Sequence, residues 1–183
     1  MNRAARVCAV LVSVLFFATA CGESGPTDAE RRADQKAAQK RQHKQEIEAA
    51  EAKQRAAQVA RYRRCMTATK PLRDALGQLN SRLNVGLNYN DYGDRLGDVQ
   101  VAYDGAVAGI KSAGGRCLGV AVPLENALNA YSKVLNLWGD CSDDYNCDFS
   151  EGETNDKAQA GWNKASRALD ASDQRLAAMR PTT

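Results

Sequence analysis

The chain has 183 residues, and its 25 Lys and Arg against 22 Asp and Glu give a formal net charge of +3. That balance does not require a nucleic acid as partner, and the export predicted below argues against one. The length suits one domain with an additional segment. The single histidine, His43, lies in a strongly polar stretch, so a folded domain elsewhere in the chain has no Ser–His or Cys–His catalytic pair.

Residues 1–20 have the three-part layout of a secretory signal peptide. Arg3 and Arg6 form a short basic start, and a mainly apolar run follows over residues 7–18. This run is shorter than the roughly 20 residues that a helix needs to cross a bilayer. We therefore predict an exported protein, with a permanent transmembrane helix as the less favoured alternative.

Small residues, Ala18, Thr19 and Ala20, lead directly into Cys21, which Gly22 follows. The stretch resembles the lipobox of bacterial lipoproteins, although that family prefers Leu at the place of Ala18. The resemblance implies that Cys21 receives a diacylglycerol and becomes the new N-terminus. It also implies that the protein is anchored to the outer, extracytoplasmic face of the bacterial cell membrane. The alternative is a plain secreted protein cleaved near Ala20, with Cys21 as a free thiol.

Residues 21–64 are predicted to form a charged stalk between the lipid and the folded domain. The part from 27 to 64 is rich in the helix formers Ala, Gln, Lys, Arg and Glu, and holds 11 basic and 6 acidic residues, a net charge of +5. Ile47 and Val59 are almost its only large aliphatic residues. A helix that is polar on all sides is weakly stabilised by packing, so we expect a stalk that is helical or partly disordered.

Residues 65–183 carry apolar residues at helical spacing in four successive segments. The segments are marked by Leu72 to Leu87, by Leu96 to Ile110, by Leu124 to Trp138 and by Ala158 to Met179. Pro123 is expected to begin the third helix, Gly139 to end it, and Pro181 to end the fourth. No segment alternates with period two, so we predict an all-α, antiparallel up-and-down bundle of about four helices. A ridge of Gly97, Val101, Gly105 and Gly109 predicts a close helix contact.

Four cysteines remain after Cys8 leaves with the signal peptide and Cys21 takes the lipid. An even number in an exported chain indicates two disulfides. An up-and-down order places Cys65 near Cys117 at one end of the bundle, and Cys141 near Cys147 in a loop at the other. We therefore predict the pairs Cys65–Cys117 and Cys141–Cys147. Zinc is disfavoured because the chain has no CxxC pair and its single histidine lies in the stalk.

The stretch from 139 to 156 is strongly acidic. Asp144, Asn146 and Asp148 repeat the one-three-five oxygen spacing of a calcium loop. However, Phe149 stands where an EF-hand has Gly, and Asn155 stands where it has Glu. The interpretations are a calcium or small-ligand site in the acidic loop 140–153, or a solvated loop tied by the Cys141–Cys147 disulfide. No resident cofactor is expected.

The two loops predicted at the end of the bundle farthest from the membrane, 88–94 and 139–153, are rich in aromatic residues. Tyrosine combines apolar area with a hydroxyl and is common in interfaces. The loops offer five candidate partner-binding residues: Tyr89, Asp91, Tyr92, Tyr145 and Phe149. The alternative is that these aromatics cap the open end of the bundle. Trp138 and Trp162 lie on apolar stripes and are expected in the core.

No catalytic constellation or phosphate-binding glycine motif is present in the sequence. We therefore expect a membrane-anchored extracytoplasmic lipoprotein that is not an enzyme. Its bundle is expected to bind an envelope protein or a cell-wall polymer through the membrane-distal end. The alternative function is binding of a small ligand or calcium in the acidic loop.

Overall fold

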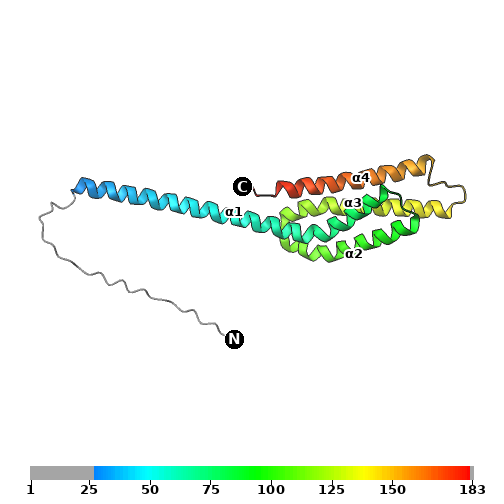
Figure 1. Ribbon diagram of the computed structural model, residues 1–183, viewed down its shortest axis with the longest axis horizontal. Helices are drawn as coiled ribbons and strands as arrows, with labels where there is room; N and C mark the ends of the chain where they lie inside the picture. Colours follow the sequence, from blue (N-terminus) through cyan, green and yellow to red (C-terminus); the bar gives the residue numbers. More distant parts are fainter. Residues whose placement is uncertain (1–26, 182–183) are drawn as a thin grey trace, which may run out of the picture. The chain divides into compact units, whose positions relative to one another are not determined.

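The computed structural model describes residues 27–181, which contain four α-helices and no β-strand (Figure 1). The helices are α1 (Asp28–Leu83), α2 (Tyr89–Ala113), α3 (Gly115–Asp143) and α4 (Gly152–Ala178). The prediction of an all-α, up-and-down helical bundle is confirmed. Cys21 and the predicted signal peptide lie outside the described residues.

The described chain divides into two units, with the boundary between residues 46 and 47. In the first unit, every described residue is exposed, and α1 begins at a capping box. The backbone N–H of Thr27 donates to Oε2 of Glu30 (2.7 Å), and the N–H of Glu30 donates to Oγ1 of Thr27 (3.4 Å). The bond from the Thr27 backbone stabilises the carboxylate and lowers the pKa of Glu30. The predicted stalk is therefore helical from Asp28 onward.

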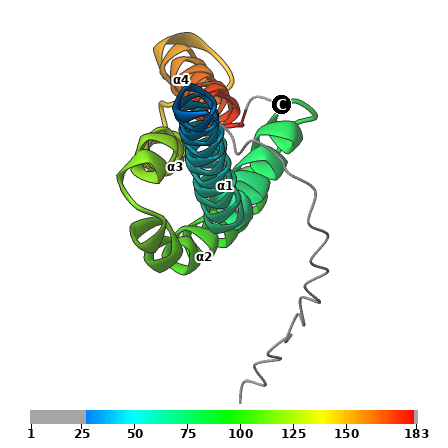
Figure 2. The same cartoon turned by 90° about the vertical axis from the view of Figure 1, so that its left-hand side faces the viewer.

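The second unit holds the bundle, in which the C-terminal part of α1 packs with α2, α3 and α4 around one apolar core (Figure 2). Tyr92 of α2 and Tyr131 of α3 are completely buried in this core. The Tyr92 hydroxyl donates to the Tyr131 carbonyl (2.9 Å) and accepts from Nε1 of Trp162 (3.3 Å). The Tyr131 hydroxyl donates to Oδ1 of Asn80 (3.0 Å). These bonds link all four helices and satisfy polar groups that would be costly to bury alone.

Both predicted disulfides are present in the structure. Cys65 of α1 is joined to Cys117 of α3 with 5.3 Å between the Cα atoms. Cys141, near the end of α3, is joined to Cys147 in the following loop with 5.2 Å between the Cα atoms. By chain entropy, the bridge across 52 residues stabilises the fold by about 4 kcal/mol, and the bridge across 6 residues by about 2 kcal/mol.

α1 continues through Pro71, because Leu72, Leu76 and Leu79 are buried in the core and their packing outweighs the lost backbone bond. The predicted boundaries of the third helix are wrong. α3 begins at Gly115 rather than Pro123, since a single residue, Gly114 with φ +90°, connects it to α2.

Gly139 does not end α3. It lies within the helix, where the Tyr89 hydroxyl would be 3.0 Å from a Cβ at this position. α4 begins at Gly152, six residues before Ala158, the first residue that marked the predicted fourth helix. The loop between α3 and α4 is therefore shorter than predicted.

The predicted glycine ridge on α2 is mostly not a helix contact. Only Gly109 approaches another helix, with the Ala68 Cβ of α1 3.3 Å from the place of a glycine Cβ. Gly97 and Gly105 have open space in that direction, and 73% of Val101 is exposed. The ridge therefore faces solvent over most of its length.

Alkaline pH is expected to destabilise the bundle through its buried tyrosines. Burial raises the pKa of Tyr92 and of Tyr131 far above the value of 10.0 that is usual for tyrosine. An unfolded tyrosine ionises near pH 10 while these two remain protonated in the fold. The contribution of these tyrosines to the free energy of unfolding is therefore complete below about pH 10, and it is lost as the pH rises above that value.

We expect the free energy of unfolding, measured in urea at about pH 8 to 11, to fall with a slope that Tyr131→Phe makes shallower. Tyr145→Phe, at a fully exposed side chain, serves as control and should leave the slope unchanged. Equal slopes in the wild type and Tyr131→Phe would show that ionisation of Tyr131 does not cause the loss of stability at alkaline pH.

Candidate functional site

The five predicted partner-binding residues do not form one exposed loop surface. Tyr89, Asp91 and Tyr92 belong to the first turn of α2, and Tyr92 is completely buried. Asn88 caps this helix: its Oδ1 accepts the Asp91 N–H (2.9 Å) and its Nδ2 donates to Oδ2 of Asp91 (2.6 Å). The prediction that these three residues lie in a loop is wrong, because the cap and the burial of Tyr92 extend the helix through this stretch.

Phe149 instead belongs to a cluster that we call the aromatic cap: Tyr89, Tyr92, Trp138, Phe149 and Trp162. Phe149 stacks on Trp138 with ring centroids 4.3 Å apart and meets the edge of Trp162 at 6.2 Å. Tyr89 and Tyr92 contact the Trp138 ring at 5.8 and 6.0 Å. These contacts fold the loop after α3 back onto the bundle, which supports the capping interpretation. Of the four aromatic residues among the partner-binding candidates, Tyr145 is the one that is fully exposed.

Two of the three calcium candidates, Asp144 and Asp148, each use one carboxylate oxygen within the loop itself. Oδ1 of Asp144 accepts the Asn146 N–H (2.9 Å), and Oδ1 of Asp148 accepts from the N–H and the hydroxyl of Ser150 (2.7 and 2.6 Å). The bonds from Ser150 lower the pKa of Asp148. Within residues 27–181, no group of three or more His, Cys, Asp or Glu side chains is placed to hold a metal ion.

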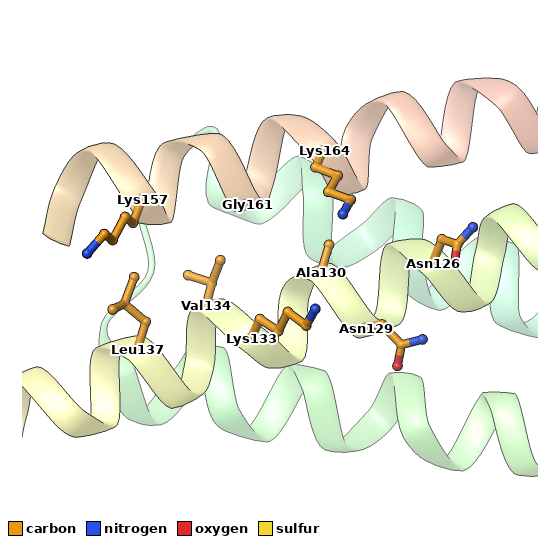
Figure 3. A pocket seen from close by; sticks show the side chains of 9 residues that line it. All are labelled: Asn126, Asn129, Ala130, Lys133, Val134, Leu137, Lys157, Gly161 and Lys164. Carbon is orange, nitrogen blue, oxygen red and sulfur yellow. The ribbon is translucent and has the colours of Figure 1, made fainter. Parts of the chain in front are cut away.

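A groove with a volume of about 440 Å³ lies between α3 and α4 (Figure 3). We call it the lysine groove. Its residues are Asn126, Asn129, Ala130, Lys133, Val134, Leu137, Lys157, Gly161 and Lys164.

The two helices approach closely here because the side chains between them are small. Ala127 and Ala130 of α3 and Ala158 and Ala165 of α4 are buried. A Cβ added at Gly161 would overlap Cγ2 of Val134, so glycine is the residue that fits opposite Val134 without a shift of either helix. The narrow seam leaves the longer residues of both helices at its outer edge, where they form the two sides of the groove.

The charge of the lysine groove is entirely positive. Lys157 pairs with Glu153 (Nζ–Oε1 2.6 Å), which lowers the pKa of Glu153. Lys133 and Lys164 have no acidic residue one helical turn away. Among the described residues, no carboxylate lies within ion-pair distance of either. Figure 3 shows their side chains on either side of Ala130, with Lys157 directed away from both.

This arrangement suits the binding of an anion rather than catalysis. The floor consists of aliphatic atoms of Ala130, Val134 and Leu137, and the sides offer ammonium and amide groups. The residues that line the groove include no carboxylate, histidine, cysteine or hydroxyl group that could serve as nucleophile or general base. An elongated ligand with anionic groups and apolar segments fits the chemistry.

Sequence reasoning missed the lysine groove, although its spacing was visible. Lys157, Gly161 and Lys164 recur at steps of four and three, as do Asn126, Ala130 and Lys133. Each set marks one face of a helix, but which two faces meet depends on the register of α3 against α4. The glycine within the α4 set was the available indication of a close helix contact.

Comparison with protein-family models, with curated proteins and with solved structures found no match to this chain. Within the described residues, no helix is both long and apolar enough to cross a membrane. The chemistry of the groove is therefore the basis for assigning a function.

We expect Gly161→Ala to destabilise the bundle by about 1–3 kcal/mol, because the added methyl overlaps Val134. Gly97→Ala is the matched control: it lies in α2 with open space around it and should stabilise by up to about 1 kcal/mol. Urea unfolding of both variants measures the difference. Adding Val134→Ala to Gly161→Ala should recover part of the loss, and an unchanged stability in Gly161→Ala would refute the close seam.

Proposed function

We propose that this protein is a lipoprotein held to the outer face of the bacterial cell membrane through a lipid on Cys21, and that its bundle is a non-enzymatic binding module. The lipobox-like sequence at residues 18–21 supports the anchor. The two disulfides support an oxidising compartment outside the cytoplasm.

The observation that carries the binding role is the lysine groove, which has three cationic side chains and no acidic residue among those that line it. We assign it to an anionic cell-wall polymer, a chain with phosphate or carboxylate groups at repeated intervals. Lys133 of α3 and Lys164 of α4 have no carboxylate partner among the described residues, so they offer two contacts to an extended polyanion from the two sides of the groove. Lys157, seven residues before Lys164 and about 10 Å away along the helix axis, is paired with Glu153 and would have to exchange that carboxylate for the polymer.

The aromatic cap is a weaker candidate for the binding surface. Four of its five rings lie on helices, and Phe149 is held against two tryptophans. Substituting these residues would disturb packing before it disturbed binding. The groove, by contrast, presents Lys133 and Lys164 to solvent without a role in the core.

The anchor is tested by intact-mass analysis of protein extracted from membranes with detergent. We expect a diacylglycerol on Cys21, and we expect Cys21→Ala to abolish lipid labelling and alter fractionation. Gly22→Ala, at the neighbouring position, is the control and should still be labelled. An unmodified, freely secreted wild-type product would refute the anchor.

The groove is tested by titrating poly(glycerol phosphate) into the protein at low salt. Lys133→Gln/Lys164→Gln should weaken binding about three- to tenfold and make it less sensitive to salt, because two screened ion pairs are lost. Lys70→Gln/Arg95→Gln removes the same charge at residues paired elsewhere on the bundle, with Asp74 and Asp98. Equal weakening by both double variants would show that net charge, not the groove, governs binding.

A further inference from the structure

A second cavity, of about 240 Å³, lies at the end of the bundle that contains the Cys65–Cys117 disulfide. Three arginines from three different segments line it: Arg61 of α1, Arg116 of α3 and Arg180, which follows α4. Tyr62 and Met179 form an apolar part of its wall. We call it the arginine pocket.

The arginines are brought together by the fold and not by bonds to one another. Arg61 lies one helical turn before Cys65, and Arg116 directly precedes Cys117, so the disulfide fixes the segments that carry both. Met179 packs with Tyr62 against the small cluster around this disulfide, which also holds Arg180 at the pocket.

Within the described chain, no Asp or Glu lies within ion-pair distance of Arg61, Arg116 or Arg180, whereas Arg73 pairs with Asp173 across α1 and α4. Among the residues that the structure describes, those that line the pocket include no Asp or Glu. All three arginines are exposed, so water and salt screen the repulsion between their charges, and an anion between them would reduce it further.

The start of α3 adds to the positive potential. Gly114 provides no side-chain cap, and the first turn of α3 has no acidic residue. Helix N-termini favour negative charge, yet the residue found in this turn is Arg116. An anion near this turn would interact favourably with both the helix N-terminus and Arg116.

We propose that the arginine pocket binds a phosphate group, either as free phosphate or as the phosphate of a lipid headgroup. Guanidinium groups are planar forks that bind phosphate oxygens in pairs, and three of them around about 240 Å³ suit one tetrahedral phosphate with a small substituent. This site is separate from the lysine groove and does not depend on the polymer assigned to that groove.

The test uses the full protein in an uncharged detergent, with inorganic phosphate, short-chain phosphatidylglycerol and short-chain phosphatidylcholine as probes, and chloride at matched ionic strength as reference. At tenfold excess over its dissociation constant, phosphate should raise the melting temperature by about 3–5 °C beyond chloride. If phosphatidylglycerol binds at least about tenfold more tightly than phosphate, the site is assigned to a lipid headgroup. If the two bind with equal affinity, the site is assigned to free phosphate.

Arg116→Gln should weaken phosphate binding about tenfold and, without phosphate, raise the melting temperature, because it relieves repulsion. Arg116→Lys should bind with intermediate affinity, since it keeps the charge but not the fork. Lys133→Gln/Lys164→Gln is the control and should retain the phosphate effect. A phosphate effect that persists in both Arg61→Gln and Arg116→Gln, or no effect in the wild type, would overturn the proposal.

Discussion

The contact between Gly161 of α4 and Val134 of α3 sets the geometry on which the rest of the bundle depends. It allows the two helices to lie closer than larger side chains would permit, and buried alanines continue the seam on both sides. α3 is then fixed on its other sides by the Cys65–Cys117 disulfide to α1 and by the bond from the Tyr92 hydroxyl of α2. Further along, Ser172 and Arg175 of α4 donate to carbonyls of α3 at 3.0 and 2.8 Å. Because α3 is held in this way, the residues on its solvent-facing flank have defined positions.

The two disulfides have different structural consequences as well as different loop lengths. Cys65–Cys117 joins helices distant in sequence and organises a small apolar cluster with Val120 and Leu176. Cys141–Cys147 constrains only the end of α3, but it directs the following chain so that Phe149 returns to Trp138. The first bridge thus stabilises the helix arrangement, and the second orders the loop that covers the aromatic end of the core.

The sequence was sufficient for the fold class and the disulfide pairing, because both follow from helical periodicity and from the alternating direction of successive helices. It misled where local composition and tertiary packing disagreed. The stretch around Tyr89 to Asp94 contains Asn, Asp and Gly, whose cost in a helix is about 1 kcal/mol or less each, while full burial of an aromatic side chain contributes about 2–3 kcal/mol. Tyr92 also continues the stripe of Leu96, Val99 and Tyr103, a pattern that favoured a helix start at Asn88. The groove was not predictable in the same way, because it depends on the register between two helices and not on either helix alone.

Net charge conceals how charge is distributed over the bundle. Residues 65–183 hold 12 basic and 15 acidic residues, a net charge of −3, yet the charged residues that line the two cavities are all basic. The acids are concentrated at the opposite end from the arginine pocket, where seven lie between Asp140 and Asp156. A bundle with this separation has an electrical polarity along its length, and an anionic surface attracts one end and repels the other. Such a field falls off within about 8 Å at physiological salt, so it acts only once the protein is already held close to its target. A membrane anchor would supply that proximity. Arginines and lysines without a carboxylate partner attract an anionic target only weakly, so they indicate a binding role more strongly in an anchored protein than in one free in solution.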